Sequence, residues 1–203
     1  MKDPENVENV KALEPDYLGF IFHPASPRFI DDFECIKRIS GVKKVGVFVN
    51  AAPAEVLRIF YDVGLDMIQL HGNENPEYCG LLKGYGLKLV KAFSVGRSFD
   101  FSITNFYAPF CEYFLFDAAG PNRGGNGIVF NWMQLKFYCG KTRFFLSGGI
   151  GPEHVDLLQA LRKHHPLLHG IDLNSRFEYS PGLKSIELLS PFVSKLKLSC
   201  HEY

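Results

Sequence analysis

Seven short apolar runs, separated by amphipathic segments, limit the possible folds of this chain more than any other feature. The runs cover residues 17–22, 44–49, 67–70, 87–93, 113–116, 143–146 and 168–173. They are continuous rather than alternating, which is typical of strands that are covered on both faces. Strands that alternate with helices form parallel sheets with right-handed crossovers. The sequence therefore predicts an α/β fold.

The segments between the runs predict eight helices. Asp3 is the expected N-cap of the first helix, with Pro4 at its first position. The others are expected at 32–39, 53–63, 76–82, 101–107, 132–137, 152–162 and 183–196. No Pro/Gly linker or charge block divides the chain, so residues 1–203 are expected to form a single domain. Periodicity alone does not separate a barrel from an open doubly wound sheet.

Composition argues against several classes of partner. Lys and Arg total 22, as do Asp and Glu, and this zero balance argues against nucleic acid. No stretch approaches the roughly 18 apolar residues of a membrane helix, and no signal peptide opens the chain. The five cysteines are scattered and never spaced as Cys-x-x-Cys. We therefore expect a cytoplasmic protein with no disulfide framework, metal or membrane partner.

Glycine and small polar residues follow the last two runs. Gly148 and Gly149 follow the run 143–146, and Asn174 and Ser175 follow the next. Glycines let backbone N–H groups approach an anion, and barrels often bind phosphate after their last two strands. The four residues therefore predict a phosphate site. The alternative is that the glycines only make a tight turn.

Three further residues stand where strands are expected to end, the usual place of function in parallel α/β folds. Asp117 is placed to be a general acid or base, although a loop or N-cap aspartate is the alternative. A glycine-rich loop at 120–127 follows it, of the type that folds over ligands. Arg28, in a loop stiffened by two prolines, suits a carboxylate, and a solvated surface arginine is the alternative. His71 is either a substrate contact or a structural residue.

Together these segments resemble a known family. The motifs are GFIF at 19–22 with SPR at 26–28, GVFVN at 46–50, QLHG at 69–72, FD at 116–117 with GGNG at 124–127, LSGG at 146–149 and DLNS at 172–175. Their order and spacing resemble those of phosphoribosylanthranilate isomerase, from about residue 3 to the final helix. Each motif is weak alone, but the ordered set is highly specific.

The resemblance implies a TIM (β/α)8 barrel that performs an Amadori rearrangement in tryptophan biosynthesis, with no cofactor or metal. Asp117 matches the general acid, and Arg28 matches the arginine near the anthranilate end of the phosphorylated substrate. Gly148, Gly149, Asn174 and Ser175 match the phosphate-binding residues. We place His71, Gly125 and Gly127 among the substrate contacts. The expected state is a monomer or a homodimer.

The chain departs from the family in three places. Asn126 stands where threonine is usual, and Arg176 where a small residue is common. The family also opens with a strand that ends in Cys-Gly-Met before Asp-Pro-Glu-Asn, and that cysteine is its general base. This chain begins Met1-Lys2-Asp3-Pro4-Glu5-Asn6. We therefore expect an incomplete barrel without its first strand, with seven parallel strands and eight helices, starting at an internal methionine.

The missing base has consequences for activity. None of Cys35, Cys79, Cys111, Cys139 or Cys200 is expected to replace it, so the chain is expected to be impaired or inactive. The runs 17–22 and 168–173 should become sheet edges, separated by an open gap or covered by a partner chain. Two other interpretations stay open: a non-catalytic barrel that binds a phosphorylated ligand, or another enzyme such as indole-glycerol-phosphate synthase, whose blocks around catalytic lysines this chain lacks.

Overall fold

A computed structural model of the chain describes residues 1–118 and 132–198. One parallel sheet holds seven strands in chain order, which are β1 (Tyr17–Ile21), β2 (Lys43–Phe48), β3 (Met67–Leu70), β4 (Leu89–Val95), β5 (Tyr113–Ala118), β6 (Phe144–Leu146) and β7 (Leu168–Ile171). Every neighbouring pair is parallel. The seven predicted strands are confirmed, with small shifts at their ends.

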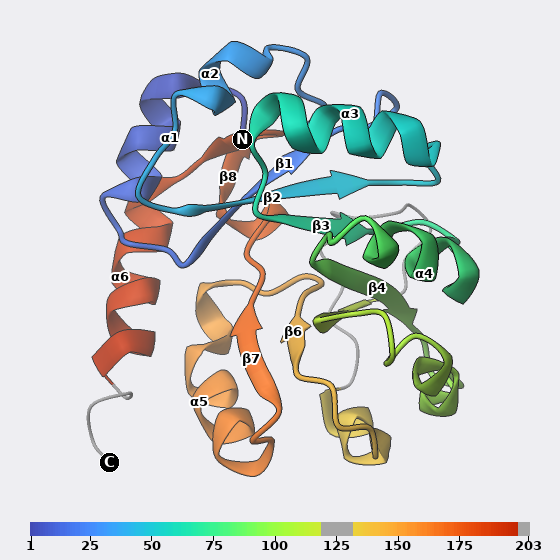
Figure 1. Ribbon diagram of the computed structural model, residues 1–203. Helices are drawn as coiled ribbons and strands as arrows, with labels where there is room; N and C mark the ends of the chain where they lie inside the picture. Colours follow the sequence, from blue (N-terminus) through green and yellow to red (C-terminus); the bar gives the residue numbers. More distant parts are fainter. Residues whose placement is uncertain (119–131, 199–203) are drawn as a thin grey trace.

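The sheet curls but does not close (Figure 1). Within the described residues, no ladder of hydrogen bonds joins β1 to β7. Two side chains approach each other across this gap, with 3.5 Å between Tyr17 Oη and His169 Nε2. Near the middle of β1, the amino group of Met1 donates to the carbonyl oxygen of Gly19 at 3.4 Å. The prediction of an incomplete barrel with seven strands is confirmed.

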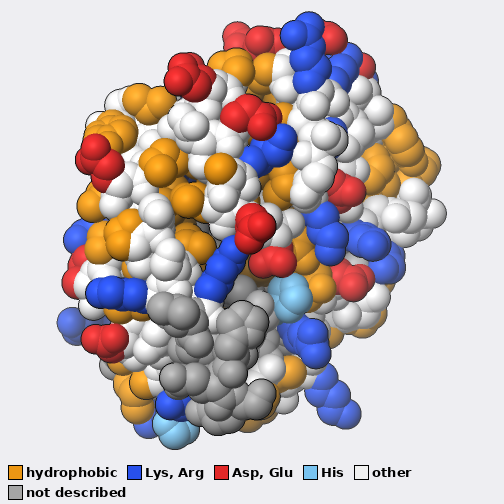
Figure 2. Space-filling model, turned by 90° about the vertical axis from the view of Figure 1, so that its left-hand side faces the viewer, with side chains coloured by type: hydrophobic (Ala, Val, Ile, Leu, Met, Phe, Trp, Pro, Cys, Tyr) orange, Lys and Arg blue, Asp and Glu red, His pale blue; other side chains and the backbone are white. Residues whose placement is uncertain are grey.

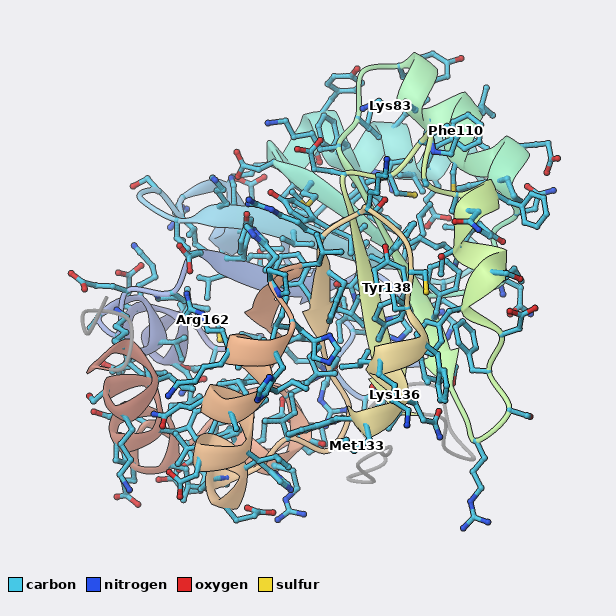
Figure 3. All side chains as sticks on the ribbon, turned by 90° about the horizontal axis from the view of Figure 1, so that it is seen from below. Lys83, Phe110, Met133, Lys136, Tyr138 and Arg162 are labelled. Carbon is cyan, nitrogen blue, oxygen red and sulfur yellow. The ribbon has the colours of Figure 1, made fainter. Side chains whose placement is uncertain are left out.

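Helices cover the outside of the sheet, as the view from below shows most clearly (Figure 3). They are α1 (Pro4–Lys11), α2 (Phe33–Lys37), α3 (Pro53–Val63), α4 (Pro76–Gly84), α5 (Val155–His164) and α6 (Ile186–Leu198), with 3-10 segments η1 (Phe101–Phe106), η2 (Trp132–Phe137), η3 (Pro152–His154) and η4 (Ser175–Phe177). Asp3 caps α1 as predicted, because its side chain accepts from the Asn6 backbone N–H at 2.7 Å. No helix in these two described ranges is long and apolar enough to cross a membrane.

The helix expected at 183–196 begins later than predicted. Leu183–Lys184 forms β9, which pairs antiparallel with β8 (Glu178–Ser180). The side chain of Asn6 accepts from the backbone N–H of Lys184 at 2.7 Å and donates to its carbonyl oxygen at 2.8 Å. These bonds to α1 hold Lys184 extended, so the helix starts only at Ile186. Strands this short leave no periodic pattern, which explains why the hairpin was not predicted.

The core has two parts. The larger part packs the helices onto the sheet, whereas a small cluster of buried side chains fills the inside of the curl: Val45, Met67, Val90, Ala92 and Leu115. Aromatic side chains pack against this inner cluster at the amino ends of the strands. Tyr113 stacks on His169 with ring centroids 4.3 Å apart, and Phe145 meets both rings edge-on. These rings line the part of the space inside the curl that lies nearest the amino ends of the strands.

Candidate functional site

A cavity of about 1800 Å³ lies inside the curled sheet; it is lined by residues at the carboxyl ends of the strands and continues along the gap between β1 and β7 to α5 and α6. The predicted site residues that the structure describes all line it: Arg28, His71, Asp117, Gly148, Gly149, Asn174 and Ser175. They come from loops that are far apart in the chain. Gly125 and Gly127 lie outside the described residues. Parallel strands place all their carboxyl ends at one rim, so one cavity collects these side chains.

Asp117 is the second-to-last residue of β5, and its buried side chain lies next to His71. The Nε2 atom of His71 lies 3.2 Å from Oδ2 of Asp117, and its Nδ1 atom lies 2.9 Å from the amide nitrogen of Gln69. An amide nitrogen only donates, so Nδ1 accepts and the ring proton is on Nε2, directed at the carboxylate. His71 therefore contacts the candidate acid directly, and its role as a substrate contact stays a prediction.

The turn after β6 needs glycine. Gly148 and Gly149 have φ angles of 89° and 64°, which L side chains rarely adopt. A Cβ atom at Gly148 would overlap the Ala118 backbone nitrogen and come within 2.7 Å of Oδ1 of Asp117. Because Gly148 has no side chain, the turn can pack directly against Asp117. The same geometry leaves backbone available to an anion, and the phosphate role of this turn stays a prediction.

Arg28 does not face the cavity as an isolated cation. Its Nε atom donates to both carboxylate oxygens of Glu178, at 3.1 and 2.9 Å, and its Nη2 donates to Oε2 at 2.6 Å. Lys184 Nζ donates to Oε1 of the same carboxylate at 3.1 Å. Burial alone would raise the pKa of Glu178, but the two cations hold it below its ordinary value. Sequence reasoning missed Glu178 because it lies in an unpredicted hairpin.

Asp172 is a second residue to which the sequence assigned no role. Burial raises the pKa of its carboxyl, and nearby Lys184 opposes that shift. Ser147 donates to Oδ2 of Asp172 at 3.1 Å. Both side chains line the cavity between Asp117 and Asn174. A signal was present, because Asp172, like Asp117, is a carboxylate at the carboxyl end of an apolar run.

The pKa of Glu178 predicts how stability depends on pH. Its folded pKa is depressed, so its stabilising contribution is present above the ordinary glutamate pKa of 4.5 and is lost as pH falls through the folded value. We expect the free energy of unfolding in urea to fall less steeply in acid for Glu178→Gln than for the unchanged chain. The comparison isolates Glu178 from Asp172, whose raised pKa acts with the opposite sign. Parallel curves for the two proteins would contradict this expectation.

The four cysteines that the structure describes lie away from the cavity, as predicted. Cys35 is in α2, Cys79 is in α4, and Cys111 precedes β5 at the end opposite to Asp117. Cys139 is exposed after η2, and Cys200 lies outside the described residues. Of the four described cysteines, none lines the cavity. Within the same two ranges, no three His, Cys, Asp or Glu side chains are grouped so as to hold a metal ion.

Known proteins resemble the chain over almost its whole length. The sequence model of the N-(5'-phosphoribosyl)anthranilate (PRA) isomerase family matches residues 1–195. An N-(5'-phosphoribosyl)anthranilate isomerase of Parabacteroides distasonis is 41% identical over 97% of this chain and 90% of its own length. The crystal structure of phosphoribosyl anthranilate isomerase from Thermus thermophilus superposes with a TM-score of 0.84 at 29% identity, over 98% of this chain and 96% of that one.

A third match holds a ligand. It is a phosphoribosyl anthranilate isomerase in complex with reduced 1-(o-carboxyphenylamino)-1-deoxyribulose 5-phosphate, with a TM-score of 0.77 and 27% identity, over 96% of this chain and 94% of that one. Family model, relative and structures agree with one another and with the ordered motifs of the sequence. The chain therefore belongs to the N-(5'-phosphoribosyl)anthranilate isomerase family.

Proposed function

We propose that this cavity is built for the isomerisation of N-(5-phosphoribosyl)anthranilate to 1-(2-carboxyphenylamino)-1-deoxyribulose 5-phosphate, a step of tryptophan biosynthesis. The observation that carries the proposal is the meeting of a carboxylic acid, a guanidinium and a glycine turn at one rim of the sheet. The aminoaldose has a ring oxygen to protonate, a carboxylate and a phosphate. Each of these groups finds a complementary partner in this set.

Asp117 is proposed to start the reaction as the general acid. Its proton goes to the furanose ring oxygen, the bond from C1 to that oxygen breaks, and the anthranilate nitrogen supplies the electron pair that makes a Schiff base. The carboxylate left on Asp117 then accepts the hydrogen bond from His71 Nε2, now 3.2 Å away. Because a charge-assisted bond is stronger than a neutral one, this contact favours the proton transfer.

The second step removes the proton at C2, and the enolamine that results tautomerises to the aminoketose. In the family that the motifs resemble, a cysteine is the base. The described cysteines do not line the cavity, so we propose that the 203-residue chain by itself performs this step slowly. Binding of the substrate does not need that base, and affinity and turnover can therefore be measured separately.

Replacement of the candidate acid tests the proposal. In a chain that carries a rim cysteine, Asp117→Asn is expected to lower the rate of conversion of the aminoaldose by about 10²–10⁴-fold, the range for one general acid, because asparagine has no acidic proton to give to the ring oxygen. The reduced aminoketose phosphate should still bind, since asparagine fills the same space. Asp31→Asn, at an exposed position, serves as the matched control. A variant that keeps the full rate would remove Asp117 from the mechanism.

Two outcomes separate the proposal from the other interpretations. A chain that binds the reduced aminoketose phosphate, but converts no substrate even when a rim cysteine is supplied, would be a binding protein. A chain that does not bind this compound would have another ligand altogether. Isothermal titration with the reduced compound therefore comes before the rate measurements.

A further inference from the structure

Behind the rim, four side chains form one continuous chain of contacts, which runs from Arg28 through Glu178 and Lys184 to Asn174. Three of them carry charge and are largely buried, with exposed side-chain fractions of 13% for Arg28, 3% for Glu178 and 10% for Lys184. Its two ends, Arg28 and Asn174, are the residues assigned to opposite ends of the substrate. Figure 2 shows acidic and basic side chains mixed over one face of the molecule. Solvent and salt screen such surface charges, whereas they screen the buried charges of this chain much less.

Glu178 determines which edge of the Arg28 guanidinium is available to a second carboxylate. A guanidinium is a planar fork of five N–H donors with two edges that can each pair with a carboxylate. Glu178 occupies the edge made by Nε and Nη2. Among the described residues, Nη1 has no hydrogen-bond partner, and Arg28 lines the cavity. With one edge held by three hydrogen bonds, the plane of the fork is set, and so is the direction of the edge left for a second carboxylate.

Lys184 sets the orientation of the Asn174 side-chain amide in a similar manner. Its ammonium group has three protons, and all three are used, on Leu173 O at 3.2 Å, Asn174 Oδ1 at 2.8 Å and Glu178 Oε1 at 3.1 Å. An ammonium group only donates, so the Asn174 atom beside it must be the oxygen. The NH₂ group of Asn174 then faces away from Lys184. Since Asn174 lines the cavity, the amide offers donors to an anion while Lys184 has none to spare.

We propose that Glu178 and Lys184 are positioning residues that set Arg28 for the carboxylate of the substrate and Asn174 for its phosphate. The inference rests on the proposed function. The carboxylate of Glu178 connects the two ends of this chain of contacts, because its Oε1 atom accepts from both Lys184 Nζ and Arg28 Nε. Among these four residues, one carboxylate lies between two cations.

The test measures the affinity of two probes by isothermal titration of the full chain. Reduced 1-(o-carboxyphenylamino)-1-deoxyribulose 5-phosphate carries both anionic groups, and inorganic phosphate carries one. Glu178→Gln is expected to weaken binding of the reduced compound by about 10-fold or more, which is the effect of one charge-assisted hydrogen bond. The same variant should change the affinity for inorganic phosphate by less than about 2-fold. Lys184→Met should weaken binding of both probes by about 10-fold, because it releases the side-chain amide of Asn174. Glu34→Gln, which breaks an exposed ion pair of 2.9 Å with Lys37, is the control.

Double variants distinguish positioning from general loosening of the structure. In an Arg28→Ala background, Glu178→Gln should have less than about 2-fold further effect on the reduced compound, because the residue through which it acts is gone. In an Asn174→Ala background, Lys184→Met should likewise add little. Glu178→Asp replaces Glu178→Gln if the latter does not fold, since it keeps the charge but is too short to hold both nitrogen atoms of Arg28 as before.

The outcomes distinguish failure of the positioning role from failure of the proposed function. Additive losses in the double variants would overturn the positioning role, as would a Glu178→Gln chain with unchanged affinity for the reduced compound. Failure of the unchanged chain to bind that compound would overturn the proposed function, and this inference with it.

Discussion

A strand that ends in Cys-Gly, joined directly before Met1, is expected to raise the isomerase rate of this chain by about 10²–10⁴-fold, the contribution of one positioned base. The family resemblance assigns removal of the C2 proton to a cysteine at that place, and no described cysteine lines the cavity. The rate is measured at saturating substrate, by following conversion of the aminoaldose. This keeps differences in affinity out of the comparison.

The position of Met1 explains why such an extension can reach the site. Met1 is buried with only 7% exposure, lines the cavity, and its amino group donates to Gly19 O on the edge of β1 that faces away from β2. Burial lowers the pKa of that amino group to about 5, and the charge of Lys184 adds to the effect. It is therefore neutral near neutral pH, so joining a peptide bond to it removes no charge from the site.

The matched control is the same extension with serine in place of the cysteine. It supplies the backbone of a strand between β1 and β7 but no thiolate, so it should increase stability with little gain in rate. If the serine version is as fast as the cysteine version, completing the sheet is what matters rather than the base. Equal rates for the extended and the 203-residue chains would overturn the proposed need for a cysteine.

Glu74→Ala is expected to lower the free energy of unfolding by about 3–5 kcal/mol, because it leaves a buried cation without its partner. Glu74 and Lys91 lie 3.0 Å apart with exposed side-chain fractions of 1% and 3%. Glu74 also accepts from the backbone N–H groups of Asn50 at 2.8 Å and Gly72 at 2.9 Å. Burial would raise its pKa, but Lys91 and the backbone N–H of Asn50 hold it below the ordinary value. The carboxylate thus ties together the loops after β2 and β3.

Urea unfolding at neutral pH measures this loss. Glu34→Ala removes a carboxylate of the exposed Lys37 pair and should cost at most about 1 kcal/mol. Lys91→Met with Glu74→Gln, which removes both charges, should recover part of the stability lost in Glu74→Ala, since no unpaired ion is left buried. A loss below about 1 kcal/mol in Glu74→Ala would mean that water or another group solvates Lys91.

Strands and their ends were predictable because the signals are local. A continuous apolar run, a proline at a helix start and a glycine pair after a strand each act within a few residues. The position of Asp117, Gly148 and Gly149 at the carboxyl ends of strands was predicted in this way, and all three line the cavity. The 3-10 segments η1 and η2 were each predicted as a helix, because a pattern of apolar residues does not record which carbonyl accepts each hydrogen bond.

The amino-acid sequence by itself determined the seven parallel strands, the family and the rim at which the site residues meet. Only the tertiary structure decided what each site residue contacts: Arg28 pairs with Glu178, 150 positions along the chain, and His71 with Asp117, 46 positions along. Periodicity reports the face of an element that is buried, and that depends on neighbours in sequence. A contact between loops depends on how strands curl past one another, and no local pattern carries that information.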